Sequence, residues 1–188
     1  MTGKSILKRE SIFHLVSAAS ILDPHNAFRA ALEIYHRQEE LTDHYPALVG
    51  LLGAPISSVV DLVMQLIRQI GRPIVHELLA GFRQSEGKVR RHLLGLIIEM
   101  GQFEEWYPLV KSEIEQGTGS SRYWAAIYLG RACGEGADWE SDATELLDHA
   151  IEILNSYRED SKNWPQAEFT LRRLGRLPWE NSFDQKEV

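Results

Sequence analysis

The amino-acid sequence predicts an all-α fold of about eight or nine antiparallel helices joined by short turns. Apolar residues recur every three or four positions through most of the 188 residues, which is the spacing of an amphipathic helix. Glycine and proline interrupt these patterns at intervals that suit helix ends. No run of alternating apolar and polar residues bounded by turn residues predicts a strand. We therefore expect helix pairs that bury their apolar stripes against one another.

Several helix boundaries are marked by residues that favour a start or a stop. Asp23-Pro24 predicts a start, because Asp accepts the free N–H groups of a first turn and Pro has no N–H to leave unpaired. Gly71 predicts a left-handed cap, and Ser85 is a candidate N-cap. Pro108 predicts a kink or a late start of the regular helix. The expected helices cover residues 11–22, 24–35, 41–52, 56–70, 74–82, 89–101, 102–116, 122–133, 143–157 and 165–174.

Helical spacing also predicts which side chains of the first two helices point inward. The first helix is expected to bury Ile12, Leu15, Val16 and Ala19, and the second to bury Ala27, Phe28, Ala31, Leu32 and Tyr35. The polar run at residues 36–40 is expected to be solvated. A metal cluster of His36, Glu39, Glu40, Asp43 and His44 is the alternative, but it lacks a tight ligand spacing.

Composition narrows the class of protein. The chain is 44% hydrophobic and 25% charged, which is typical of a soluble globular protein. Its net charge of −7 argues against a nucleic-acid partner, because phosphates repel an acidic surface. The single Cys133 excludes an intrachain disulfide, and its apolar neighbours predict a buried, inert thiol. We see neither a signal peptide nor a run of about 18 apolar residues, so we expect a cytoplasmic protein without membrane contact.

The helix ends suggest an internal repeat. The segments IRQIG, IIEMG, GRACG and LRRLG end at Gly71, Gly101, Gly134 and Gly175, at intervals of 30, 33 and 41 residues. Intervals in this range are typical of helical solenoids.

The clearest unit of this repeat is the helix at residues 89–101. Its Val89-Arg90, Leu93, Ile97 and Gly101 resemble the second helix of a HEAT-like repeat, and Arg122, Ala125 and Leu129 match the same pattern. The resemblance implies a right-handed α-α superhelix, a short HEAT-like solenoid. It also implies that Arg90 and Arg122 link neighbouring units. The expected organisation is an N-terminal helical cap (1–40), four degenerate helix pairs continuous with it (41–175) and a polar C-terminal tail (176–188).

The resemblance further implies a functional surface, because the second helices of HEAT-like stacks line the concave face. The side chains expected to point outward there, or to flank those that do, are rich in arginine and aromatic rings, the residue types that dominate protein-binding hot spots. The alternative is that these arginines are solvated side chains near helix C-termini. The predicted partner-binding residues are Gln65, Arg68, Arg91, His92, Tyr123, Trp124, Arg131 and Arg172.

The predicted function is a non-enzymatic scaffold or adaptor that binds another protein. A more specific hypothesis is an immunity or inhibitor protein of a bacterial toxin. An acidic surface on the first helices of the pairs is a second candidate contact surface, and the sequence leaves both open. The acidic residues are Glu33, Glu39, Glu40, Glu104, Glu105, Glu113 and Glu115.

The alternative function is a HEAT-like DNA glycosylase acting on damaged bases, which the acidic net charge opposes. No catalytic, metal-binding or cofactor-binding motif is found in the sequence, so none is predicted.

Overall fold

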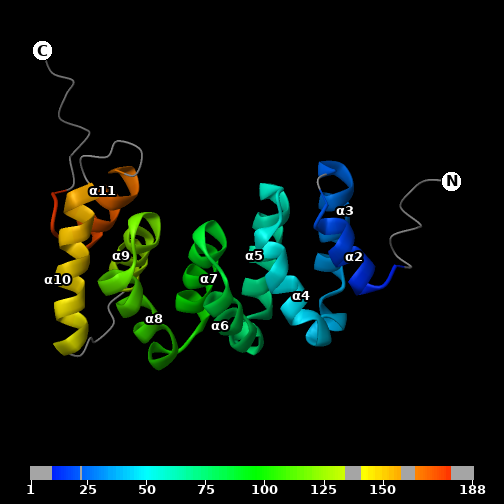
Figure 1. The fold of residues 1–188 in the computed structure, drawn as a ribbon, viewed down its shortest axis with the longest axis horizontal. Coiled ribbons are helices and arrows are strands. Elements are labelled where there is room, and N and C mark those ends of the chain that lie inside the picture. Colours follow the sequence, from blue (N-terminus) through cyan, green and yellow to red (C-terminus); the bar gives the residue numbers. More distant parts are fainter. Residues whose placement is uncertain (1–9, 22, 134–140, 158–163, 179–188) are drawn as a thin grey trace, which may run out of the picture. The chain divides into compact units, whose positions relative to one another are not determined.

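The computed structural model describes residues 10–21, 23–133, 141–157 and 164–178, and within them the protein is helical and has no strand (Figure 1). The predicted all-α class is therefore confirmed. The described residues form ten α-helices, more than the eight or nine expected, because each predicted range forms a helix of its own. The α-helices are α2 (Ile12–Ala19), α3 (Pro24–His36), α4 (Tyr45–Gly50), α5 (Ser57–Ile70), α6 (Val75–Gln84), α7 (Gly87–Met100), α8 (Phe103–Gln116), α9 (Gly119–Cys133), α10 (Ser141–Ser156) and α11 (Trp164–Arg173).

Four short 3-10 helices connect some of these helices. They are η1 (Gln38–Glu40), η2 (Thr42–His44), η3 (Leu51–Gly53) and η4 (Arg72–Ile74). Among the described residues, no helix combines the length and the hydrophobicity needed to cross a bilayer.

The predicted start at Asp23-Pro24 is confirmed. The Asp23 carboxylate accepts hydrogen bonds from the backbone N–H groups of His25 and Asn26, at 3.1 and 3.4 Å, and Pro24 is the first residue of α3. Asp23 therefore satisfies two N–H groups that have no partner inside the helix.

Glycine controls several helix boundaries, although not always as predicted. Gly71 ends α5 and Gly175 follows α11, both with a positive φ (69° and 67°) that other residues adopt only with strain. The predicted N-cap at Ser85 is wrong. Ser85 instead ends α6, where its hydroxyl donates to the carbonyl of Phe82 at 3.3 Å, and α7 begins at Gly87 with a φ of 55°. The helix at Pro108 runs on without a break.

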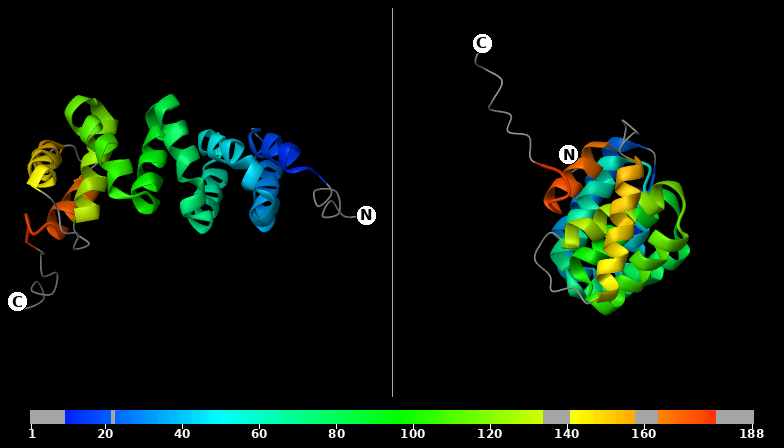
Figure 2. Two further views of the ribbon diagram at one scale, coloured as in Figure 1. Left: turned by 90° about the horizontal axis from the view of Figure 1, so that it is seen from below. Right: turned by 90° about the vertical axis from the view of Figure 1, so that its left-hand side faces the viewer.

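The chain divides into two compact units, residues 1–106 and 107–188, and the division falls within α8. The organisation predicted from the sequence has its boundaries elsewhere, between the cap and the helix pairs after residue 40 and between the helix pairs and the tail after residue 175. In unit 1, α3 packs against α5 and α5 against α7, while α2 packs against α4 and α4 against α6 (Figure 1). The α2–α3 and α6–α7 pairs join these two rows, and Figure 2 shows them from two further directions.

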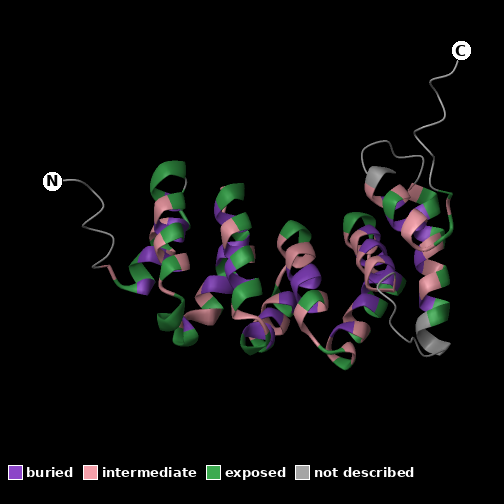
Figure 3. Cartoon of the chain, turned by 180° about the vertical axis from the view of Figure 1, so that it is seen from behind, coloured by how far each residue is buried: buried purple, intermediate pink, exposed green. Residues whose placement is uncertain are grey.

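The helices of unit 1 bury one face and expose another (Figure 3). On α5 the buried residues lie three or four positions apart, as the sequence predicts for an amphipathic helix. The largest fully buried side chains of this unit include Leu15, Ile34, Leu41, Leu48, Leu51, Leu52, Leu66, Ile67, Ile74, Leu78 and Leu93.

The apolar stripe expected on α3 is wrong in part. The buried residues are Ala27, Ala30, Ala31 and Ile34, whereas Phe28 and Leu32 are exposed. The small alanines lie on the side where α3 packs against its neighbours, and helices approach most closely where side chains are small. The two larger side chains are left outside that contact.

In unit 2, α9 packs against both α10 and α11, and these two helices pack against each other. Because α9 has neighbours on more than one side, its buried residues extend around most of the helix. They are Tyr123, Ala125, Ala126, Ile127, Leu129 and Gly130.

The two arginines expected to link neighbouring units bond mainly inside their own helix pair. Arg90 donates to the carbonyl of Phe82 and Arg122 to that of Ile114, in each case eight residues earlier, near the end of the preceding helix. These two bonds therefore hold each arginine to the preceding helix of its own pair. Arg122 also contacts Nε2 of His149 on α10 at 2.8 Å, so it does reach the following helix as well.

Candidate functional site

The first four predicted partner-binding residues lie on α5 and α7, two helices of unit 1 that pack against each other. Gln65 and Arg68 are exposed on α5, and Arg91 and His92 are half-buried on α7. We call these four residues the α5–α7 face. The structure therefore places this part of the predicted surface on adjacent helices, with side chains that solvent can reach.

Arg68 of this face is held by an ion pair across the two helices. Its Nε lies 2.6 Å from one carboxylate oxygen of Glu99, and its Nη2 lies 3.1 Å from the other. Both side chains are solvent-accessible, so the pair contributes little to stability. The two-point contact does fix the plane and direction of the guanidinium group.

Similar polar contacts join neighbouring elements of unit 1 at residues 31 to 34 positions apart in sequence. The Gln69 amide donates to the Tyr35 hydroxyl and accepts from Gln38 at 2.8 Å. Arg72 forms a two-point pair with Glu105, and the hydrogen bond from Arg72 lowers the pKa of that carboxyl. The polar contacts therefore follow a period close to the one expected from the helix ends.

These ion pairs change the electrostatics expected for the predicted surface. The charge of Arg68 is matched by Glu99 and that of Arg72 by Glu105. Unit 1 therefore presents oriented donors rather than a strongly positive surface.

His92 is the most unusual member of the α5–α7 face. Its Nε2 is buried and has no hydrogen-bond partner among the described residues. Burial lowers the pKa of His92, and the positive charges of Arg91 and Lys88 lower it further, while Asp61 on α5 acts in the opposite direction. His92 is therefore neutral at physiological pH.

The other four predicted residues lie in unit 2, so the structure does not join all eight in one unit. The prediction that Tyr123 points outward is wrong, since this side chain is only 1% exposed. Its ring packs against Tyr157 and Trp124, with centroids 5.0 and 5.5 Å apart. The reason is the two-sided packing of α9, which a pattern taken from one helix pair does not include.

The remaining three residues of that group are half-buried. Trp124 packs against Tyr128 on its own helix, at a centroid distance of 5.9 Å. Arg172 forms an ion pair with Glu168 one turn earlier on α11. Arg131 lies in the last turn of α9. Their surroundings favour a structural role more strongly than those of the α5–α7 face.

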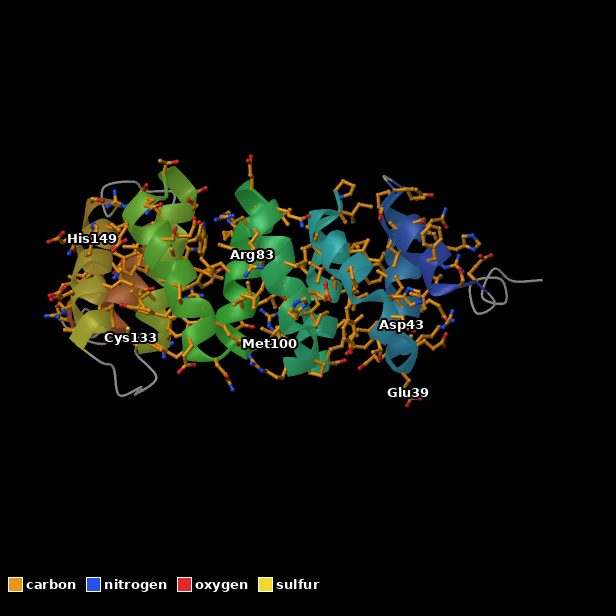
Figure 4. All side chains as sticks on the ribbon, turned by 60° about the horizontal axis from the view of Figure 1, so that its bottom comes forward. Glu39, Asp43, Arg83, Met100, Cys133 and His149 are labelled. Atoms are coloured by element: carbon orange, nitrogen blue, oxygen red, sulfur yellow. The ribbon has the colours of Figure 1, made fainter. Side chains whose placement is uncertain are left out.

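Neither a metal centre nor a reactive thiol emerges from the described residues. No group of three or more His, Cys, Asp or Glu side chains there is arranged to hold a metal ion. Arg37 pairs with Glu40 inside the polar run at 36–40, and Glu39 and Asp43 lie near it (Figure 4). Burial raises the pKa of the Cys133 thiol to about 12, so the thiolate that would act as a nucleophile is scarce.

Sequence reasoning missed one surface feature. Phe13, Ile21, Phe28 and Leu32, on α2, α3 and the connection between them, are all exposed. The signal that could have shown this for α3 is the series Ala27, Ala30, Ala31 and Ile34, which by itself completes a helical stripe.

The comparisons with known proteins add no relative. No family model matches the chain, and neither the comparison with curated proteins nor that with solved structures found a match.

Proposed function

We propose that the protein is a helical-repeat scaffold, similar to HEAT-like proteins, that binds another protein through the α5–α7 face. The observation that supports this most directly is the recurrence within unit 1. Successive helices pack in two rows, and polar side chains 31 to 34 residues apart bond across neighbouring elements. Repeat proteins of this kind present extended surfaces that serve mainly for binding.

The α5–α7 face suits protein recognition because part of it is already ordered. Glu99 holds the guanidinium of Arg68, so a partner need not supply the energy to order that side chain. Gln65 on α5 can both donate and accept hydrogen bonds, and Arg91 on α7 provides positive charge. Arginine is enriched among the residues that dominate binding energy at protein interfaces.

The contribution of this face can be tested with two variants in which side chains are replaced by glutamate. Tagged wild-type protein is crosslinked and purified from its native cell, and the recovered partner is identified by mass spectrometry. We expect Gln65→Glu/Arg91→Glu to lose that partner. Arg83→Glu, which changes an exposed arginine on α6, should retain it (Figure 4).

The outcomes separate the parts of the proposal. A partner that both variants retain would show that the α5–α7 face is not the contact surface. Failure to recover any protein with the wild-type chain would contradict the scaffold function itself. Unfolding curves for each variant establish that a lost partner is not the result of a lost fold.

The proposal includes the more specific hypothesis that the partner is a bacterial toxin that this protein neutralises. A toxin gene next to the gene for this chain, and loss of toxin inhibition in Gln65→Glu/Arg91→Glu, are the expected findings. The DNA-glycosylase alternative predicts binding to duplex DNA that weakens steeply with added salt. Absence of such binding would exclude that alternative.

A further inference from the structure

The hairpin formed by α2 and α3 exposes an unusual amount of apolar side chain. Phe13, Ile21, Phe28 and Leu32 are between 38% and 67% exposed, and they occur within 20 residues of sequence. Single exposed apolar residues are common on soluble proteins, whereas groups of them mark contact surfaces. We call these four residues the hairpin apolar set.

Two members of the set lie on one face of α3. Phe28 and Leu32 are four residues apart in an uninterrupted helix, so their side chains are neighbours. The residues that bind α3 to the rest of unit 1, Ala27, Ala30, Ala31 and Ile34, lie on its other side. The exposed pair therefore does not contribute to the core.

The other two members lie at opposite ends of the hairpin. The Arg37 guanidinium donates to the carbonyl of Glu10 at 2.6 Å, so the end of α3 lies beside the start of α2. Phe13 follows Glu10 by one turn and therefore lies near this open end. Ile21 lies at the turn that leads to Asp23 and Pro24. Apolar side chains thus follow the hairpin along its length.

This arrangement differs from what a terminal cap requires. A capping unit at the end of a repeat array carries a polar outer face, because no further unit covers it. The sequence assigns residues 1–40 to such a cap, yet the described part of that segment exposes two phenylalanines. The hairpin is better suited to contact with another molecule.

The charge around the hairpin indicates the kind of molecule. The described residues of this segment, 10–21 and 23–44, contain six acidic residues, two arginines and no lysine, a net charge of −4. Residues 1–9, which carry Lys4, Lys8 and Arg9, lie outside the described residues. One of the two arginines, Arg37, is paired with Glu40. A positively charged partner is therefore attracted to this end of unit 1 and a negatively charged one is repelled.

From the exposed apolar side chains and the acidic surroundings together, we infer that the α2–α3 hairpin docks a basic amphipathic helix of a partner protein. The apolar face of that helix covers Phe28 and Leu32, and its flanking lysines or arginines meet the acidic residues. Recognition of amphipathic helices through apolar anchors one turn apart is a common mode of peptide binding. This surface lies outside the α5–α7 face, and the inference does not depend on that face being functional.

The test uses two synthetic peptides and the full-length chain. One peptide repeats leucine at positions i, i+3, i+4 and i+7 with lysine between, and the other has the same composition in an order without an apolar stripe. Binding is followed by fluorescence anisotropy as salt is added. The proteins are wild type, Phe28→Gln/Leu32→Gln and the control Phe169→Gln, which removes another exposed phenylalanine, from α11.

We expect the striped peptide to bind wild type and Phe169→Gln alike, and to bind Phe28→Gln/Leu32→Gln at least about tenfold more weakly. Binding should weaken as salt screens the charges, and the scrambled peptide should not bind. Equal binding of both peptides, or equal binding by all three proteins, would overturn the inference. Unfolding curves show that the double variant remains folded.

Two further outcomes would show that something other than a partner helix covers the hairpin. A wild-type dimer in sedimentation velocity that Phe28→Gln/Leu32→Gln dissociates would show that a second copy of the chain covers the hairpin. Binding of the striped peptide that appears only after Lys4, Lys8 and Arg9 are changed to Glu would assign that place to the chain's own first residues. Either result overturns docking of a partner helix.

Discussion

The Arg90 guanidinium donates a hydrogen bond to the backbone carbonyl of Phe82 at 2.8 Å, and its central carbon lies 4.0 Å from the centre of the Phe82 ring. It also donates to the carbonyl of Ser85 at 3.2 Å. One side chain on α7 thus satisfies two carbonyls at the end of α6 and covers an aromatic ring of the core. Arg122 on α9 makes a related contact, since its Nε donates to the carbonyl of Ile114 on α8 at 2.9 Å.

Replacing Arg90 with Ala should destabilise the protein by about 1–3 kcal/mol, because the Phe82 carbonyl loses a charged donor in a partly buried position. Arg90→Lys should not restore the loss fully, since lysine lacks the planar group that reaches two carbonyls and stacks on the ring. Urea unfolding measures both effects. Arg83→Ala, at an exposed position on α6, serves as the control and should change stability by less than about 0.5 kcal/mol.

Gly130 is expected to tolerate no side chain. A Cβ at this position would lie 2.5 Å from the Thr170 methyl group and 3.2 Å from Leu174, where α9 meets α11. Gly130→Ala should therefore cost about 1–3 kcal/mol of stability. In Gly50→Ala the new Cβ meets nothing within 4 Å, so this helical position should gain up to about 1 kcal/mol instead. Thermal unfolding measures both variants, and a Gly130→Ala variant as stable as wild type would contradict the packing at Gly130.

The lowered pKa of His92 predicts a pH-dependent stability. Burial disfavours the charged imidazole in the folded protein, whereas the unfolded chain takes up a proton near its ordinary pKa of about 6.5. The stability that comes from burying His92 as a neutral ring is therefore fully present above about pH 6.5. It is lost as the pH falls toward and through the lower pKa of His92 in the folded protein.

The measurement compares urea midpoints at neutral and mildly acidic pH for wild type, His92→Gln and His76→Gln. We expect His92→Gln to reduce the loss of stability on acidification. His76 has a highly exposed side chain, so His76→Gln should leave that loss unchanged. An unchanged pH dependence in His92→Gln would show that burial of this ring does not control it.

The Cys133 thiol should react slowly in the folded protein. With its pKa raised to about 12 by burial, the thiolate fraction at pH 8 is far below that of a free cysteine, whose pKa is about 8.5. Mass spectrometry after iodoacetamide treatment should show little labelling of native protein and rapid labelling in urea. Native labelling as fast as that of free cysteine would contradict the described burial.

Much of the secondary structure follows from the sequence because it depends on local chemistry. Asp23 and Pro24 start α3, and Gly71 ends α5, through hydrogen bonds and backbone angles within a few residues of each. The apolar spacing on α2 also identifies most of its buried face, since Ile12, Leu15 and Ala19 are buried as predicted, whereas Val16 is half-buried. The prediction for Cys133 holds only in part, because this residue is half-buried rather than buried.

The tertiary structure decided which of several possible faces each helix buries. On α3 the alanines form the contact and Phe28 and Leu32 do not, because close approach of the neighbouring helices favours small side chains. On α9 the two-sided packing buries Tyr123, and on α7 the partner of Arg90 is a carbonyl of the preceding helix. Helical periodicity predicts the direction in which each side chain points around the axis of its helix. Only the arrangement of the neighbouring helices determines whether that direction leads to the core or to solvent.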